Sequence, residues 1–264
     1  MNIWAVVNQK GGVGKTTTAI TVGGILAQNN KKTLLIDLDP HGSLSSYLGI
    51  NPELEERGVY QLFQKVNNQT HHELSGLIHE TNFKNLFILP ASTAMATLER
   101  QLGEKSGMGL VLKKALNVDA LPFDKVIIDC PPMMGLLMIN ALATCERIII
   151  PVQTEHLAIK GMERMLRSIK MIQTSLNVNL DYTLLPTMYD KRTSACKESL
   201  QHLQYEHSEQ LSDIVIPIDT RLRDASHKGM PLSHMSGESQ SLSAYRKLVK
   251  VLSQPIRAID REVA

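Results

Sequence analysis

A glycine-rich run near the start of the chain, Lys10–Thr17, limits the fold more than any other feature of the sequence. It reads Lys-Gly-Gly-Val-Gly-Lys-Thr-Thr and lies between the apolar run Ile3–Val7 and the helix-forming run Lys15–Gln28. Glycines let successive backbone N–H groups turn toward an anion, and the following helix adds the positive end of its dipole. A strand, a glycine loop and a helix in this order predict a loop that wraps the phosphates of a nucleotide.

Two side chains of this run have the chemistry that a nucleoside triphosphate requires. Lys15 can reach the β- and γ-phosphates, and the hydroxyl of Thr16 can bind Mg²⁺. The alternative is a strand-to-helix turn with a chance lysine, and the elements on either side argue against it. We therefore expect the nucleotide and Mg²⁺ to bind at Lys10, Gly11, Gly12, Val13, Gly14, Lys15, Thr16 and Thr17.

Short apolar runs alternate with helix-forming stretches along the chain, which is typical of a parallel sheet with crossover helices. The runs are almost continuously apolar, as expected for strands covered on both faces. We expect strands at Ile3–Val7, Thr33–Asp37, Leu86–Leu89, Val126–Asp129, Arg147–Val152, Tyr182–Pro186 and Ile214–Ile216, and helices at Lys15–Gln28, Met134–Ala143, Met162–Thr174, Ala195–Tyr205 and Leu242–Leu252. The prediction is an α/β P-loop fold, a mostly parallel sheet with helices on both faces, in one domain over residues 1–264.

Composition excludes several classes of protein. A hydrophobic content of 43% and a charged content of 20% are those of a soluble globular protein. The net charge of +2 excludes a polybasic protein, so any contact with nucleic acid must be local. No run approaches the roughly 18 apolar residues of a membrane span, and the start lacks a signal peptide's features. Cys130, Cys145 and Cys196 form no CxxC pair, so we expect packing roles for them and a reducing cytoplasm around the protein.

Two of the expected strands end in carboxylates. One ends Asp37-Leu38-Asp39-Pro40, and strand alternation places Asp37 and Asp39 on the same face. Ligands of open α/β sheets bind at the carboxyl edge, where a carboxylate can orient a water toward the γ-phosphate. The alternative is that Asp39 only begins a turn before Pro40. Asp129 ends a later strand and is placed to hold Mg²⁺ through its water shell.

The glycine run departs from the usual phosphate-binding loop at its first position. That loop has a glycine five residues before Gly14, where this chain has Gln9, and a second lysine, Lys10, opens the glycine run. This is the deviant form of the loop, and here the sequence resembles the ParA/MinD family of ATPases. The resemblance, which extends over essentially the whole chain, implies that ATP with Mg²⁺ is sandwiched in a homodimer. It also implies that Lys10 contacts the nucleotide held by the partner subunit.

The resemblance implies roles for the carboxylates as well. It makes Lys10, Lys15 and Asp39 the catalytic residues. Asp39 positions the attacking water and also binds Mg²⁺, with Asp37 as its supporting neighbour. It makes Asp129 the magnesium carboxylate of the Walker B strand. Two residues after the position of Asp39, the family usually has Gln, whereas this chain has His41. Histidine can still donate a hydrogen bond, but its protonation changes near neutral pH.

Two segments toward the C-terminus, residues 186–193 and 217–226, resemble stretches that border the adenine and contact DNA in this family. The residues at the matching positions are Thr187, Met188, Pro217 and Ile218 for adenine, and Arg192 and Arg221 for DNA. From residue 190 to the end, eleven Lys and Arg stand against ten Asp and Glu, so composition indicates no basic face. The alternative is therefore that Arg221 and Arg223 pair with Asp219 and Asp224. The C-terminal helix resembles the membrane-targeting tail of the MinD branch, but Pro255 interrupts it, and we expect its apolar residues Leu248, Val249 and Leu252 to face the core.

Residues 39–43, 92–100, 153–158 and 219–226 look most like the chemotaxis-associated ParA-like proteins, often called ParC, of polar-flagellated bacteria. This resemblance implies an ATPase that directs chemotaxis arrays to the cell pole, with an adaptor that tethers it or stimulates hydrolysis. The first alternative is plasmid or chromosome partition, in which the ATP-bound dimer rides the nucleoid. An iron–sulfur reductase of the nitrogenase-iron-protein type would need paired cysteines from each subunit. A metabolic kinase would need an acceptor site, and the sequence indicates none.

Overall fold

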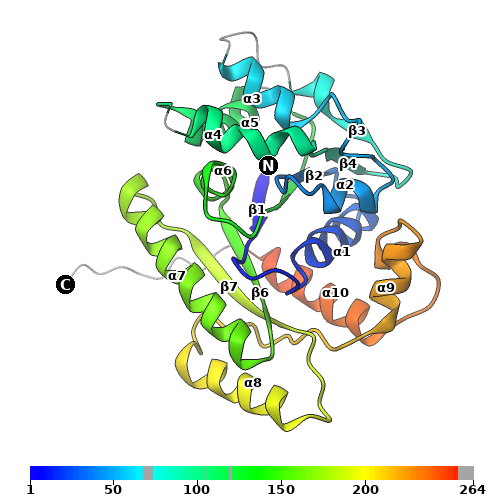
Figure 1. The fold of residues 1–264 in the computed structure, drawn as a ribbon. Coiled ribbons are helices and arrows are strands. Elements are labelled where there is room, and N and C mark those ends of the chain that lie inside the picture. The colour runs from blue at the N-terminus through cyan, green and yellow to red at the C-terminus, as the bar shows by residue number, and fades with distance from the viewer. Residues whose placement is uncertain (68–73, 104, 119–120, 255–264) are drawn as a thin grey trace.

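The computed structural model describes residues 1–67, 74–103, 105–118 and 121–254, and its centre is a seven-stranded sheet (Figure 1). The strand order is β3-β4-β2-β5-β1-β6-β7. The strands are β1 (Asn2–Val6), β2 (Thr33–Asp37), β3 (His79–Glu80), β4 (Leu86–Leu89), β5 (Lys125–Asp129), β6 (Arg147–Gln153) and β7 (Asp181–Thr187). Neighbouring strands run parallel, except that the short edge strand β3 runs antiparallel to β4.

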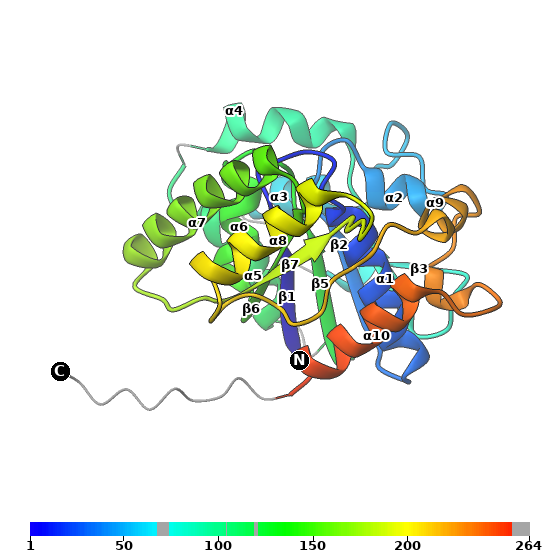
Figure 2. The same cartoon turned by 90° about the horizontal axis from the view of Figure 1, so that it is seen from below.

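Helices cover both faces of this sheet. They are α1 (Lys15–Gln28), α2 (Ser43–Tyr47), α3 (Val59–Asn67), α4 (Leu98–Leu102), α5 (Val111–Val118), α6 (Leu136–Thr144), α7 (His156–Leu176), α8 (Ser194–Glu206), α9 (Thr220–His227) and α10 (Gln240–Leu252). Figures 1 and 2 show α1 and α10 on one side of the sheet and α6 and α7 on the other. The expected α/β fold is confirmed.

Strand alternation explains why the molecule has two hydrophobic cores. Along β1, the side chains of Ile3 and Ala5 join the core under α6 and α7, while Trp4 and Val6 join the core under α1 and α10. Successive side chains of a strand point to opposite faces, so a strand covered on both faces must be apolar throughout. In α10, the side chains of Leu248, Val249 and Leu252 are buried in the second of these cores, as expected.

The prediction of a strand at Ile214–Ile216 is wrong. The chain after α8 forms two isolated bridges, Leu211 with Leu184 of β7 and Pro217 with Tyr189, which lies just after β7. Between its hydrogen bonds to β7, this segment advances four residues, from Ser212 to Ile216, while β7 advances only two. The longer segment must bow away from its neighbour, so no continuous ladder forms.

Among the other expected elements, α1, β2 and β4 have the expected bounds, and the rest are present with shifted ends. The largest shift is in α7, which begins at His156 rather than Met162. Five short helices, α2, α3, α4, α5 and α9, were not expected from the sequence. Among the described residues, no helix is long and apolar enough to cross a membrane.

Candidate functional site

The candidate site lies where the central strands β1, β2 and β5 end. The last residues of β2 and β5, Asp37 and Asp129, are register partners, and Asp129 also pairs with Val6 of β1. The glycine run begins four residues after Val6. Parallel pairing therefore brings two buried carboxylates and the loop to one edge of the sheet, where ligands of open α/β sheets bind.

The glycine loop has a backbone that favours glycine and space beside it for a ligand. Gly12 and Gly14 have φ of +77° and +92°, which strain residues with side chains. A Cβ added at Gly11, Gly12 or Gly14 would meet no atom within 4 Å. The loop borders a cavity of about 340 Å³, which is also lined by Lys15, Thr16, Thr17, Asp39, His41, Ser43, Pro132 and Met188. The glycines thus leave open a cradle that a side chain would partly fill.

Lys15 supplies a positive charge at this cradle. Its side chain is largely buried, and its Nζ donates to the carbonyl oxygen of Lys10 at 3.2 Å. Burial lowers the pKa of Lys15, while the carboxylates of Asp129 and Asp39 act in the opposite direction. Within the described part of the chain, no carboxylate forms an ion pair with Lys15. An anion in the cradle would stabilise the charge of this lysine.

Asp129 has an unsatisfied oxygen that fits a cation. Its Oδ2 accepts a hydrogen bond from Thr16 Oγ1 at 2.7 Å, whereas its buried Oδ1 has no partner among the described residues. Burial and the charge of Asp37 raise the pKa of Asp129 well above its ordinary value. A buried polar atom without a partner costs free energy, and Mg²⁺ prefers such oxygen donors. The hydroxyl of Thr16 and the carboxylate of Asp129 therefore fit Mg²⁺.

Asp37 is tied to the backbone around it rather than open to the cavity. Its Oδ2 accepts hydrogen bonds from the N–H and the hydroxyl of Ser45, both at 2.8 Å, and its Oδ1 accepts from the N–H of Asp39 at 3.1 Å. Burial raises the pKa of Asp37 to about 6, although these hydrogen bonds act to lower it. Asp37 thus fixes the turn on which Asp39 lies.

Asp39 lines the cavity and contacts His41. Its Oδ1 accepts a hydrogen bond from the N–H of His41 at 3.0 Å and lies 2.8 Å from His41 Nδ1. The side chain of Asp39 is mostly buried, whereas that of His41 is 81% exposed. The histidine holds the orientation of this carboxylate from the solvent side.

Lys10 lies beside α7 in this chain and does not line the cavity. Its Nζ forms an ion pair with Glu155, the N-cap residue of α7, and its backbone N–H donates to Asn8 Oδ1 at 2.9 Å. A Cβ added at Gly161 would lie 3.3 Å from Lys10 Cβ. Sequence reasoning missed Glu155, because the two residues are 145 positions apart and no local pattern joins them.

The expected adenine contacts do not all meet at the same cavity. Thr187 is buried, and its Oγ1 donates to the carbonyl oxygen of Val13 at 3.0 Å, which ties the loop to the end of β7. Met188 lines the cradle cavity and has an unusual positive φ of 53°. Pro217 and Ile218 line a separate cavity of about 810 Å³ instead.

The two arginines expected to contact DNA make different interactions. Arg192 is 80% exposed, and its Nε and Nη2 bind the carboxylate of Asp190 at 2.9 and 2.7 Å. These hydrogen bonds hold the pKa of Asp190 at about 2. Arg221 instead donates to the backbone carbonyls of Glu238, at 2.8 Å, and Ser236. The expected alternative, that the guanidinium of Arg221 pairs with nearby aspartates, is therefore wrong.

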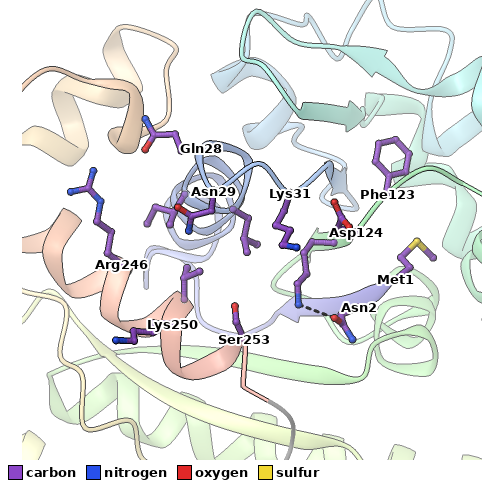
Figure 3. A pocket seen from close by; sticks show the side chains of 14 residues that line it. Met1, Asn2, Gln28, Asn29, Lys31, Phe123, Asp124, Arg246, Lys250 and Ser253 are labelled. Atoms are coloured by element: carbon purple, nitrogen blue, oxygen red, sulfur yellow. Dashed lines mark hydrogen bonds between the residues drawn. The ribbon is translucent and has the colours of Figure 1, made fainter.

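A larger cavity, of about 1140 Å³, lies near the start of β1 and β5, at the opposite edge of the sheet (Figure 3). Arg246 and Lys250 of α10 line it together with Lys31, which follows α1. Lys125 Nζ, also on its wall, donates to Asn2 Oδ1 at 2.8 Å and lies 4.7 Å from the centroid of a Trp4 ring. The residues lining this cavity include no glycine.

Comparisons with known proteins agree with this geometry. Residues 1–182 match the family model described as an AAA domain. The chromosome-partitioning ATPase Soj of Treponema pallidum is 36% identical over 92% of this chain and 94% of its own length. The chromosome partitioning protein ParA of Myxococcus xanthus is 32% identical over 95% of this chain and 87% of its own length.

Solved structures agree as well. The structure of cobyrinic acid a,c-diamide synthase from Mycobacterium smegmatis with bound ADP and magnesium has a TM-score of 0.81 and 33% sequence identity. The match covers 96% of this chain and 94% of that one. The McdA structure from Cyanothece in its apo form has a TM-score of 0.84 at 21% identity over 95% and 98% of the two chains, and shows the shared fold. The chain therefore belongs to the AAA-domain family, in the group of P-loop ATPases that contains ParA and Soj.

Proposed function

We propose that this chain is an ATP-hydrolysing switch that positions or segregates a cargo inside the cell. The observation that carries the proposal is the open glycine cradle with Lys15 beside it and a buried oxygen of Asp129 without a protein partner. The names of the Soj and ParA relatives and the ADP and magnesium in the M. smegmatis structure support it. ATP and Mg²⁺ are the ligands that this combination fits.

The residues of the chain divide the chemistry among them. The N–H groups of the loop and the Lys15 ammonium would bind the phosphates, and the Thr16 hydroxyl and the Asp129 carboxylate would hold Mg²⁺. When bound, Mg²⁺ neutralises charge on the phosphates. Asp39, held by His41, orients the attacking water and accepts its hydrogen bond.

The switch depends on the pairing of two copies. Lys10 leaves Glu155 and contacts the nucleotide of the partner subunit, so ATP is enclosed between identical chains. Loss of the γ-phosphate removes contacts to the loop and to the turn that carries Asp39, and the dimer then separates. An adaptor protein accelerates this cycle.

Replacing Asp39 tests the hydrolytic step. Asp39→Ala should lower the rate of ATP hydrolysis by about 100-fold or more while ATP affinity changes by less than about threefold, because positioning of the water is lost and the phosphate contacts remain. Single-turnover phosphate release and titration with ATP measure the two quantities. Asp124→Ala, at the opposite edge of the sheet, is the matched control. Hydrolysis at the wild-type rate by the Asp39 variant would refute the assignment.

Two observations point to different cargoes. Residues 39–43, 92–100, 153–158 and 219–226 favour chemotaxis arrays at the cell pole, and the names of the relatives favour chromosome or plasmid partition. A fluorescent fusion expressed in its own cell separates these proposals. A polar focus beside chemoreceptors supports the first, and patches over the nucleoid support the second.

DNA binding by the ATP-bound dimer is best tested at Arg192. Because the guanidinium of Arg221 contacts two backbone carbonyls, Arg221→Glu would disturb the loop near α10 as well as any DNA contact. Arg192 is exposed, and charge reversal there should weaken binding to duplex DNA and lessen its dependence on salt. Mobility shifts at two salt concentrations measure this. Equal DNA binding by the wild type and the Arg192→Glu variant would show that Arg192 does not contact DNA.

The buried cysteines do not favour an iron–sulfur reductase. Cys130 and Cys145 are both buried, so neither thiol reaches a surface that a second subunit could share.

A further inference from the structure

One face of α7 is exposed along its length and carries a regular pattern. Leu157, Lys160, Arg164, Arg167 and Met171 follow one another at spacings of three and four residues, and all of them are exposed. Residues at these spacings lie on the same face of a helix. We call these residues, together with the neighbouring Lys170, the α7 stripe. The apolar side chains at its two ends, Leu157 and Met171, are 67% and 72% exposed.

The charge of the α7 stripe is entirely positive. None of its four cations, Lys160, Arg164, Arg167 and Lys170, forms an ion pair with another residue in the described part of the chain. The only acidic residue of α7, Glu163, lies off the stripe and is half-buried. Like charges at these spacings repel each other and destabilise a helix. The isolated chain therefore gains nothing from this arrangement.

The opposite face of α7 holds the helix firmly in place. Ala158, Ile159, Met162, Met165 and Ile169 are buried in the core on that side of the sheet. The exposed stripe is thus a formed helical surface. Leu157 and Met171 are fourteen positions apart, which corresponds to two heptads, or about 21 Å of helix at about 1.5 Å per residue.

The same helix contacts the phosphate loop at several points. Gln9 Nε2 donates to Ser168 Oγ at 2.9 Å, and Lys10 forms its ion pair with Glu155 at the start of α7. Lys10 also lies so close to Gly161 of α7 that a Cβ added to this glycine would be 3.3 Å from Lys10 Cβ. A partner that binds α7 therefore acts directly on the elements that hold Lys10.

We propose that the α7 stripe is the docking surface for an acidic amphipathic helix of a partner protein. Carboxylates of that helix face the four cations, and two apolar residues two heptads apart pack on Leu157 and Met171. A second copy of this chain is a poor occupant, because two such stripes would oppose cations to cations. Nucleic acid would use the cations but would leave the exposed leucine and methionine without packing partners. The effect of docking on ATP turnover, through Lys10, rests on the proposed function. The docking itself does not.

The test uses the full chain without nucleotide, so its outcome is independent of ATP binding. The probe is a labelled synthetic helix of about 18 residues, with two leucines fourteen positions apart and glutamates on the same face between them. Arg164→Glu combined with Arg167→Glu should weaken binding by about tenfold or more, measured by fluorescence anisotropy. The matched control, Lys113→Glu with Lys114→Glu, reverses two exposed cations of α5 and should change binding by less than about twofold.

A second pair of variants distinguishes helix docking from simple attraction of charge. Leu157→Ser with Met171→Ser should weaken binding by about fivefold while leaving the four cations in place. Undiminished binding by this pair, or by the α7 charge-reversal pair, would overturn the proposal. The proposal would also be overturned if the wild-type protein bound a labelled DNA duplex more tightly than the acidic helix and the α7 charge-reversal pair abolished that binding. Circular dichroism melting of each variant shows whether it is folded.

Discussion

The two edges of the sheet differ in what their charged groups contact. At the amino edge, a cavity of about 1140 Å³ is lined by cations, of which Lys125 contacts Asn2 and Arg246 pairs with Glu238. At the carboxyl edge, the cavity is only about 340 Å³, yet a buried oxygen of Asp129 has no partner in the described chain and the glycine loop leaves a cradle open. A site is identified by groups that only a ligand can satisfy, and cavity volume alone would have selected the wrong edge.

The largest expected difference between the edges is in ATP affinity. Lys15→Gln should weaken ATP binding by more than about 100-fold, because it removes the charge-assisted contacts to the phosphates. Lys125→Gln, which removes a lysine at the amino edge, should change the affinity by less than about twofold. Isothermal titration with ATP and Mg²⁺ measures both. Equal effects of the two variants would abolish the distinction between the edges.

A buried carboxylate at the carboxyl edge should also make the stability of the ligand-free protein depend on pH. Burial raises the pKa of Asp37 in the folded protein to about 6, whereas the ordinary pKa of an aspartate is 3.8. Between these values the native state binds more protons than the unfolded chain, so stability present at low pH is lost as the pH rises. The difference between these two pKa values corresponds to about 3 kcal/mol of unfolding free energy.

Asp37→Asn isolates this effect. The amide of the variant keeps only one of the two acceptor oxygens that bind Asp39 and Ser45, but the cost of losing the other does not depend on pH. The difference in unfolding free energy, wild type minus variant, should therefore fall by about 2.4 kcal/mol between pH 4 and pH 7.5. Urea unfolding at a series of pH values measures it. A difference that stays constant over this range would show that Asp37 is ionised throughout.

The smallest effect is expected at the amino edge. Lys250 lines the large cavity, and no described residue forms an ion pair with it. Lys250→Ala should leave both the rate of ATP hydrolysis and the stability within experimental error, since a solvated lysine near a helix C-terminus contributes less than about 1 kcal/mol. A clear loss of ATP turnover in the Lys250→Ala variant would show that the larger cavity takes part in the ATPase cycle.

Sequence reasoning worked where the physics is local. The loop, the central strands and α1 could be predicted because glycine spacing and continuous apolar runs are properties of short segments. The five-residue helices α2 and α4 were missed, since little more than one turn shows little periodicity. Helix α3 was overlooked although its buried residues Val59, Leu62 and Phe63 recur at helical spacing. Ile214–Ile216 has strand composition, but its relation to β7 depends on the length of the chain between two contacts.

The contacts that hold the candidate site depend on the folded chain. The ion pair of Lys10 with Glu155 joins residues 145 positions apart, and the hydrogen bond of Thr187 with Val13 joins residues 174 apart. Nothing in either local sequence indicates its partner. The residues that meet the ligand were therefore easier to predict than the residues that position them.

The most direct test of the account is the mass of the Asp39→Ala protein in solution. By light scattering during gel filtration, the account predicts 29.4 kDa in ADP and twice that mass in ATP with Mg²⁺, because slow hydrolysis preserves the dimer. Adding Lys10→Ala should return the protein to a monomer that still binds ATP. A monomer in ATP, or a dimer that forms without Lys10, would contradict the enclosure of nucleotide between two subunits.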